Sequence, residues 1–417
     1  MSGIAALAPF RTKSFRFQWP ADLLTAWALE METLILGWYV LVETGSVLLL
    51  TVFGSLQFVG TLISPVLGML GDRWGLRNVL AVMRLWYAGC ASILLALAIS
   101  GQLDPMLVLV VAALSGMVRP SDIGMRSALV GATIPPGSLV AAMGISRTTQ
   151  DSARVGGALA GAGFMASFGM GPAYMVIASL YIAGALLTLM VDRKPQAEAP
   201  STVASATTRI SAWRDLTEGL VYVWRTPQLL AAMSLAALVN LTAFPLTGGL
   251  MPYIARDVFH LEQQGFGLLV ASFASGAFIG SVTLSFLGAR VRPARLMMAT
   301  SVIWYLCLLG FVLSTSLPVA MGLLVIAGLM QSLSMVTLAI ILLRTSEERF
   351  RGRIMGVRML AIYTLPLGLL IAGGLIPRLG YHTTALIFVL TGLALTIQIA
   401  VTWRADLIRR DAIGNAG

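Results

Sequence analysis

Residues 68–77 read GMLGDRWGLR, a charged stretch between two long and largely apolar runs. Three glycines, one aspartate and two arginines fall within these ten residues. A loop that only turns the chain and carries basic charge needs the arginines, but it has no use for an aspartate at a fixed distance from glycines. The stretch therefore predicts a loop that makes a specific contact, placed between two helices that cross a membrane.

The composition of the whole chain excludes a water-soluble domain. Of its 417 residues, 58% are hydrophobic and only 11% are charged, whereas soluble domains carry about 25% charged residues. Apolar runs of roughly 18–25 residues recur along the sequence, and each could cross the ~30 Å hydrocarbon layer as a helix. We therefore expect an all-α integral membrane protein.

The apolar runs predict twelve transmembrane helices. They are expected at residues 18–42, 46–70, 78–100, 105–128, 138–166, 170–191, 228–254, 265–288, 295–315, 317–342, 354–377 and 382–403. The longest polar stretch, 192–227, divides them six and six, so bundles are expected at 1–191 and 228–404, with a tail at 405–417. The 192–227 linker is expected to end in an amphipathic helix that places Trp213, Tyr222 and Trp224 at the membrane interface.

Basic residues lie almost entirely on one side of these spans, and only Arg256 and Arg378 fall on the other. Because cytoplasmic loops collect lysine and arginine, both termini and the central linker are expected in the cytoplasm of a bacterial cell, with the protein in the inner membrane. The N-terminal stretch lacks a short apolar core followed by a small-residue cleavage site, so no cleaved signal peptide is expected.

The sequence lacks the residues that several classes of function would need. Cys90 and Cys307 lie inside apolar runs, and His260 and His382 lie near loops, so no metal site, no cofactor and no enzymatic chemistry are expected. The net charge of +10 is distributed over loops between the spans, which argues against nucleic acid as a partner. No G-x-x-x-x-G-K-[ST] signature is present, so an ion gradient is the expected energy source. We expect a monomer embedded in the lipid bilayer.

The pattern Gly68-x-x-x-Asp72-Arg73-x-Gly75-x-Arg77, between the second and third of twelve spans, resembles the loop signature of the major facilitator superfamily. This resemblance implies two six-helix bundles related by a pseudo-two-fold axis, which carry a small molecule by alternating access. A short internal repeat agrees with it, since MGI at 143–145 opens the fifth span and MGV at 355–357 opens the eleventh.

Three further stretches narrow the resemblance. Residues 44–80, 218–230 and 350–356 are similar to the branch that contains drug:proton antiporters and enterobactin exporters. Two details depart from the antiporter pattern: the fifth span has GGALAG at 156–161 without the usual proline, and Arg119 is followed by Pro120 with the next glycine one position late. With that departure, Arg119 is matched to the arginine that relays protons in the family.

The superfamily resemblance also implies what the opening loop does. Asp72 is expected to accept hydrogen bonds at the start of the eleventh helix, near residues 352–356, because exposed N–H groups and the helix dipole favour an acid there. Arg73 and Arg77 are expected to pair with acids of the same half, while Gly68 and Gly75 allow close approach and a tight turn. These five residues are predicted to form a conformational latch between the halves.

Charges inside the predicted spans are costly and normally face a cavity or a partner. The candidates for proton coupling are Glu30, Glu32, Arg119, Asp122, Asp151 and Arg154. Glu30 and Glu32 are about 200° apart on a helix, so both cannot face one cavity. We predict that one of them exchanges a proton while the other charges compete with it. The alternative is a static ion-pair network between the fourth and fifth helices, in which Arg126 and Arg147 also take part.

A substrate cavity is expected between the halves near the middle of the membrane. Its candidate lining residues are Trp27, Gln57, Asn240, Phe244, Met251, Gln331 and Tyr363, a mixture that suits an amphiphilic organic molecule. The favoured function is proton-driven export of small amphiphilic molecules. A specific siderophore or metabolite exporter, an importer on the same fold and a membrane sensor that transports nothing are the alternatives.

Overall fold

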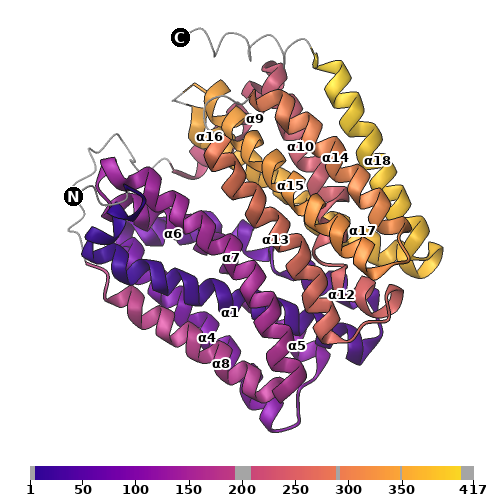
Figure 1. Cartoon of the computed structure of the whole chain (residues 1–417). Helices are drawn as coiled ribbons and strands as arrows, with labels where there is room; N and C mark the ends of the chain where they lie inside the picture. Colours follow the sequence, from indigo (N-terminus) through magenta and orange to yellow (C-terminus); the bar gives the residue numbers. More distant parts are fainter. Residues whose placement is uncertain (1–4, 193–207, 288–291, 348–349, 405–417) are drawn as a thin grey trace. The chain divides into compact units, whose positions relative to one another are not determined.

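The computed structural model describes residues 5–192, 208–287, 292–347 and 350–404, and every element in these ranges is a helix (Figure 1). The first half contains α1 (Lys13–Thr44), α2 (Val47–Leu56), α3 (Ser64–Trp74), α4 (Leu76–Ile99), α5 (Pro105–Gly116), α6 (Arg119–Thr133), α7 (Pro136–Phe168) and α8 (Met170–Leu189). Short 3₁₀ segments, Ala5–Arg11 and Val59–Leu62, precede α1 and join α2 to α3.

The second half begins with α9 (Thr208–Arg225), α10 (Pro227–Thr242), α11 (Phe244–Thr247), α12 (Met251–Tyr253) and a π-helical turn, Ile254–Val258. It continues with α13 (Gln263–Leu287), α14 (Pro293–Leu313), α15 (Leu317–Thr345), α16 (Arg351–Ile362), α17 (Thr364–Leu379) and α18 (Tyr381–Thr402). The predicted tail, 405–417, and the first part of the predicted linker, 193–207, lie outside the described residues.

The all-helical membrane fold is confirmed, and each of the twelve predicted spans falls on one helix or on a helix broken into two or three shorter ones. Within the described residues, nine helices or helix pairs are long and apolar enough to cross a membrane, and Val47–Thr61 and Pro227–Thr242 are shorter apolar helices. The amphipathic part of the linker corresponds to α9, which ends one residue before α10 begins.

Two breaks in the first half meet at a close helix crossing. The α2–α3 segment is interrupted at Gln57–Ile63, and the α5–α6 segment at Met117 and Val118. A Cβ at Gly60 would overlap the carbonyl group of Met117, and one at Gly116 would overlap the carbonyl group of Leu56. Glycine is required at both positions because two backbones lie in direct contact.

The second half repeats this arrangement between its own second and fourth spans, α13 and α15. A Cβ at Gly276 would overlap the carbonyl group of Val325, and one at Gly328 would overlap that of Phe273. Paired glycines therefore set the same close crossing at corresponding places of both halves, as expected of a fold built from a repeat.

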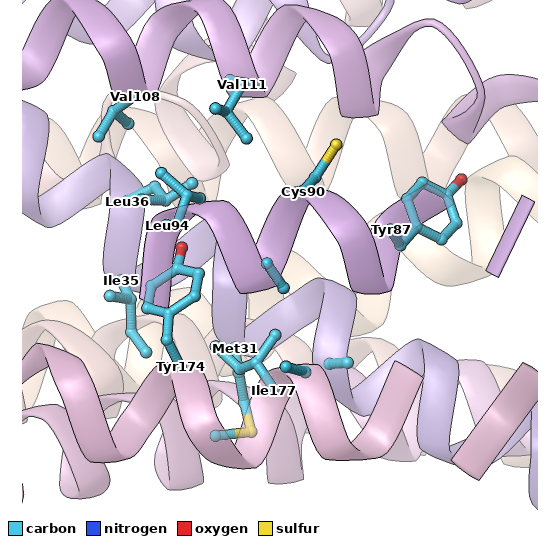
Figure 2. Packing of buried hydrophobic residues seen from close by; sticks show 14 of the residues in the cluster. Met31, Ile35, Leu36, Tyr87, Cys90, Leu94, Val108, Val111, Tyr174 and Ile177 are labelled. Atoms are coloured by element: carbon cyan, nitrogen blue, oxygen red, sulfur yellow. The ribbon is translucent and has the colours of Figure 1, made fainter. Parts of the chain in front are cut away.

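The chain forms two compact units, and each is described by itself. Unit 1 comprises Met1–Ala197 and Pro252–Ala271, and unit 2 comprises Glu198–Met251 and Ser272–Gly417. In the core of unit 1, Tyr174 and Ile177 on α8 lie against Met31 and Ile35 on α1 (Figure 2). Because α1 packs along both α7 and α8, the acids on α1 are positioned by these two neighbours.

The core of unit 2 contains two buried aromatic side chains and two pairs of hydrogen-bonded hydroxyl groups. Trp304 and Tyr305 on α14 are fully buried, and the Tyr305 hydroxyl lies 2.6 Å from the Thr242 hydroxyl on α10. Ser301 on α14 and Ser334 on α15 are joined in the same way at 2.6 Å. Hydroxyl pairs of this kind join helices where the surrounding lipid offers no hydrogen-bond partner.

Candidate functional site

Glu30 lies on the side of α1 that faces α7. Its Oε1 atom is 3.6 Å from Nε of Arg154 on α7, and both side chains are partly exposed. The backbones of α1 and α7 are close here, since a Cβ at Gly157 would come within 2.8 Å of the Glu30 Cβ and 3.3 Å of the Trp27 carbonyl oxygen. The glycine thus allows the approach that brings Glu30 to Arg154. The result is an accessible carboxylate–arginine pair within a transmembrane helix.

Glu32 points in a different direction and is buried. The Tyr181 hydroxyl on α8 donates a 2.6 Å hydrogen bond to its Oε2 atom. Its Oε1 atom has no hydrogen-bond partner among the described residues. Tyr87 on α4 lies beside Tyr181, with ring centroids 5.4 Å apart. Glu32 is therefore part of the polar core between α1, α4 and α8.

Arg119 lies at the glycine crossing of the broken helices. Its Nη1 atom donates to Oε1 of Gln57 at 2.6 Å and to Oγ1 of Thr33 at 2.8 Å. Arg119 is the first residue of α6, and Pro120 follows in the first turn, where its missing N–H has no cost. Arg119 is also close enough to Glu32 for the two charges to interact. It joins α1, the α2–α3 break and α6 at one point.

The remaining charges of α6 and α7 pair within their own helices. Asp122 Oδ2 lies 2.9 Å from Arg126 Nε, and Asp151 Oδ2 lies 3.3 Å from Arg147 Nε, both at i,i+4 spacing. Among the described residues, no ion pair joins α6 to α7, because each acid already has an arginine one turn away on its own helix. The structure thus shows two ion pairs within helices, and the part that these charges play in transport stays a prediction.

Arg84 and Asp22 form a second buried ion pair. Both charges are present in predicted spans, but their pairing was not predicted from the sequence. Arg84 on α4 is fully buried and contacts Oδ1 of Asp22 on α1, and its other terminal nitrogen contacts the Thr188 hydroxyl on α8. The signal that could have revealed it is two opposite charges near the same ends of their predicted spans.

A small cavity adjoins Asp22 of this pair within unit 1. Its lining residues come from α1, α6 and α7 and are Asp22, Arg126, Ser127, Val130, Ser146, Thr149 and Gln150. It has room for about one water molecule, and several polar groups surround it.

The opening loop forms a tight turn at Gly75. This residue has φ +85°, a left-handed value that favours glycine, and it joins α3 directly to α4. At Gly68, in contrast, an added Cβ would meet no described atom of unit 1 within 4 Å. The turn function of Gly75 is therefore visible in the structure, whereas close approach at Gly68 is not.

The charged residues of the loop differ from what the resemblance implied. Arg77 donates to the Leu189 carbonyl at 3.3 Å and the Val191 carbonyl at 2.9 Å, at the end of α8, and to the Asn78 side chain at 3.2 Å, rather than to an acid. These contacts suit a cation at a helix C-terminus. Arg73 is exposed. The side chain of Asp72 lies outside the described residues, so its contact with the eleventh helix stays a prediction.

The predicted cavity residues fall in both units. In unit 1, Trp27 packs on Gly156 of α7 and Gln57 binds Arg119. In unit 2, Phe244 meets Trp304 edge to face at 5.4 Å, Asn240 donates to the Ala236 carbonyl of its own helix at 2.8 Å, Met251 and Gln331 are buried, and Tyr363 is partly exposed. Met251, the first residue of α12, has no exposed surface.

In sequence and in fold, the chain resembles known membrane proteins. The profile of a family described as transmembrane secretion effector, MFS_3, matches residues 4–414. The multidrug efflux pump Tap of Mycobacterium tuberculosis is 30% identical over 199 residues, which are 46% of this chain and 46% of Tap, and Tap of Mycobacterium bovis matches equally. The chain thus spans about half the length of the curated relatives it matches.

Solved structures with the same fold cover nearly the whole chain. A mutant of the nucleoside transporter NupG superposes with a TM-score of 0.71 at 15% identity, covering 93% of this chain and 99% of that one. A bacterial metal transporter gives 0.68 at 13% identity, with 94% and 99% covered. A bacterial homologue of the human lysosomal transporter Spinster gives 0.63 at 13% identity, with 98% and 97% covered. At these identities the likeness shows the fold and no substrate.

Proposed function

Because the chain belongs to the transmembrane secretion effector family of the major facilitator superfamily, we propose that it exports small amphiphilic molecules through the bacterial inner membrane, driven by protons. The family and the fold make the protein a multi-pass membrane transporter and not an enzyme. Export, the substrate class and the coupling ion are the proposal. The match to the multidrug efflux pump Tap supports export and an amphiphilic substrate.

The pair formed by Glu30 and Arg154 carries the proton-coupling part of the proposal. A carboxylate at membrane depth that has water access and one arginine partner can release that partner when it takes up a proton. Both side chains are partly exposed and 3.6 Å apart, so the contact is neither buried nor tightly bonded. Glu30 is therefore the acid of α1 that exchanges the proton, and Arg154 is the charge that competes for it.

Glu32 and Arg119 have supporting parts in this scheme. Glu32 is buried and accepts a short hydrogen bond from Tyr181, so it holds α1 against α8 in this conformation. Arg119 binds Gln57 and Thr33 at the breaks of two helices. Transporters of related architecture bind substrate at discontinuous helices near the midplane. Gln57 and Trp27 are the unit 1 residues that we assign to substrate contact, and Asn240, Phe244, Gln331 and Tyr363 are those of unit 2.

The test is accumulation of amphiphilic dyes, drugs and siderophores in bacterial cells that lack their own pumps, with and without this protein. Proton-driven export predicts lower accumulation, abolished by a protonophore. Glu30→Gln is expected to remove the proton-dependent part of export, while Glu43→Gln is the matched control, since Glu43 is an exposed acid at the other end of α1.

Two results would contradict the proposal. Higher accumulation in cells with the protein would mean import. If the Glu30→Gln variant still exported and the protonophore still abolished that export, Glu30 would not be the acid that couples transport to protons. Expression of each variant in the membrane fraction is measured alongside, so that loss of protein is not read as loss of coupling.

A further inference from the structure

The linker helix α9 has two apolar faces, and unit 2 covers only one of them. Gly219 and Val223 are buried, while Leu220, Val221 and Trp224 are exposed by 42%, 49% and 76%. At 100° per residue, Leu220 and Trp224 lie on one side of the helix and Tyr222 on the opposite side. A soluble surface helix would place polar residues where this one places Leu220, Val221 and Trp224.

The covered face is attached to the beginning of α16. A carboxylate oxygen of Glu218 lies 2.8 Å from Nη1 of Arg353, and the Tyr222 ring stacks on Phe350 with centroids 4.3 Å apart and planes 15° apart. A Cβ at Gly219 would come within 3.3 Å of the Arg353 backbone oxygen. The helix is thus joined to α16 by an ion pair, a ring stack and close backbone packing.

The short connection between α9 and α10 indicates what covers the exposed face of α9. Only Thr226 separates the end of α9 from the first residue of α10, an apolar helix of the bundle. The C-terminal turn of α9, which carries Val221 and Trp224, therefore lies within a few ångströms of the point where a span enters the membrane. α9 also packs on α16, whose Met359 and Leu360 are themselves exposed, as expected of side chains that face lipid.

The described charge beside the exposed face that is not already paired with α16 is positive. Arg225 ends the helix and is exposed, whereas Glu218 lies 2.8 Å from Arg353. Tryptophan at the headgroup level with flanking arginine is the composition of helices that lie in a membrane interface, where basic residues are attracted to anionic lipids. A protein partner would not require this combination next to a span.

We propose that the Leu220–Val221–Trp224 face of α9 lies in the headgroup region of the adjacent leaflet, cytoplasmic in the predicted orientation, and binds anionic lipid through Arg225. Because the opposite face is joined to α16, lipid bound there fixes the start of the eleventh span. The anionic lipid content of that leaflet then alters the movement of α16, independently of which molecule the protein carries.

The contact is tested with fluorescence quenching on the full chain in vesicles. The background is Cys90→Ser with Cys307→Ser, and Trp224→Cys receives a bimane label. Quenchers are a lipid with a nitroxide near the headgroup and iodide in the water. Gln102→Cys, in an exposed turn after α4, is the aqueous control, and Ile182→Cys, an exposed apolar position within α8, is the lipid control.

The proposal expects label 224 to be quenched several-fold more by the headgroup nitroxide than label 102, and to be protected from iodide. Quenching by the nitroxide should rise when part of the phosphatidylcholine is replaced by phosphatidylglycerol, and Arg225→Gln should remove that rise. Iodide quenching equal to that of label 102 would overturn the proposal and indicate a face for a cytoplasmic protein. Equal quenching in both vesicle types would overturn the anionic-lipid part. The readout needs no transport, so its failure is separate from failure of the proposed function.

Discussion

At the scale of single residues, Arg84 is the charged side chain whose burial most requires a compensating partner. It is fully buried in unit 1, and its charge is balanced by Asp22 on α1. The same side chain reaches Thr188 and the Gly184 carbonyl on α8, so one guanidinium joins three helices. Burying an ion pair gives little net stability, but removing one partner leaves a buried charge without compensation.

Asp22→Ala is therefore expected to lower the stability of the protein by about 3–5 kcal/mol, the cost of breaking a buried pair. Asp22→Asn keeps a hydrogen-bond acceptor and should lose less. Replacing both partners, with Arg84→Met in the Asp22→Ala background, should recover part of the loss. The measurement is thermal unfolding of the purified protein in detergent, with Glu43→Gln as control. An unchanged melting temperature for Asp22→Ala would show that the Asp22–Arg84 pair does not contribute to the stability of the protein.

The two acids of α1 show what sequence predicts at this scale. The helical repeat alone placed Glu30 and Glu32 on different sides, and they do contact different neighbours, Arg154 and Tyr181. The partners themselves were not predictable, because they depend on how α7 and α8 pack against α1. The same limit applies to α6 and α7, where Arg126 and Arg147 each pair with an acid one turn away on their own helix.

At the scale of elements, the contact between α1 and α7 determines where Glu30 lies. Gly156, Gly157 and Gly161 on α7 each lie against α1, at Trp27, Glu30 and Met31 respectively. No proline is present in this stretch, yet the helices approach closely because these positions have no side chain. The three glycines therefore bring helix five against helix one without a proline.

Gly157→Ala is expected to separate α1 from α7, because the new Cβ would lie 2.8 Å from the Glu30 Cβ and 3.3 Å from a backbone oxygen. Overpacking of this kind costs about 1–3 kcal/mol. Proton-dependent export should fall with it, since Arg154 moves away from Glu30. Gly163→Ala is the matched control on the same helix, because an added Cβ there meets nothing within 4 Å. Thermal stability and export are measured for both; equal behaviour of the two variants would contradict the argument.

Element boundaries were predicted less completely than the spans. Each of the twelve segments predicted from hydropathy coincides with one or more helices. Among the described residues, nine helices or helix pairs are long and apolar enough to cross a membrane, and α7 is not one of them. Hydropathy therefore located the segments. It did not predict the breaks at Gln57–Ile63 or at Tyr363 between α16 and α17. Hydropathy averages over a window and does not register where a backbone turns. The paired glycines that mark the crossings were visible in the sequence, but single glycines are too common in membrane helices to indicate a contact.

At the scale of the whole molecule, unit 1 contains residues from beyond the linker. Pro252–Ala271 belongs to it, and Arg256 in the π-helical turn donates to the Leu41 carbonyl at 2.6 Å, at the end of α1. Trp38 on α1 stacks on Phe266 of α13, with centroids 5.5 Å apart and planes 14° apart. A Cβ at Gly267 would overlap the side chain of Ala162 on α7. The same helix, α13, continues beyond Ala271 into unit 2.

This continuity yields a prediction about the transport cycle. Alternating access requires one half to rock against the other, and a helix that is packed on unit 1 at one end and belongs to unit 2 at the other must give up one of these contacts. The contacts available for release are those that Pro252–Ala271 makes with α1 and α7, namely the Trp38–Phe266 ring stack, the Arg256 hydrogen bond and the close approach of Gly267 to Ala162.

Trp38→Cys with Phe266→Cys, in the Cys90→Ser and Cys307→Ser background, should therefore stop transport when a thiol-reactive linker that contains a disulfide joins the two cysteines. Export is expected to be lost on treatment with the linker and restored when a reductant cleaves it, while either single cysteine variant stays insensitive to both treatments. Because the linker spans the space that the two stacked rings fill, it should not lower the melting temperature. Full export by the cross-linked protein would mean that this contact persists through the cycle, and that the halves separate elsewhere along α13.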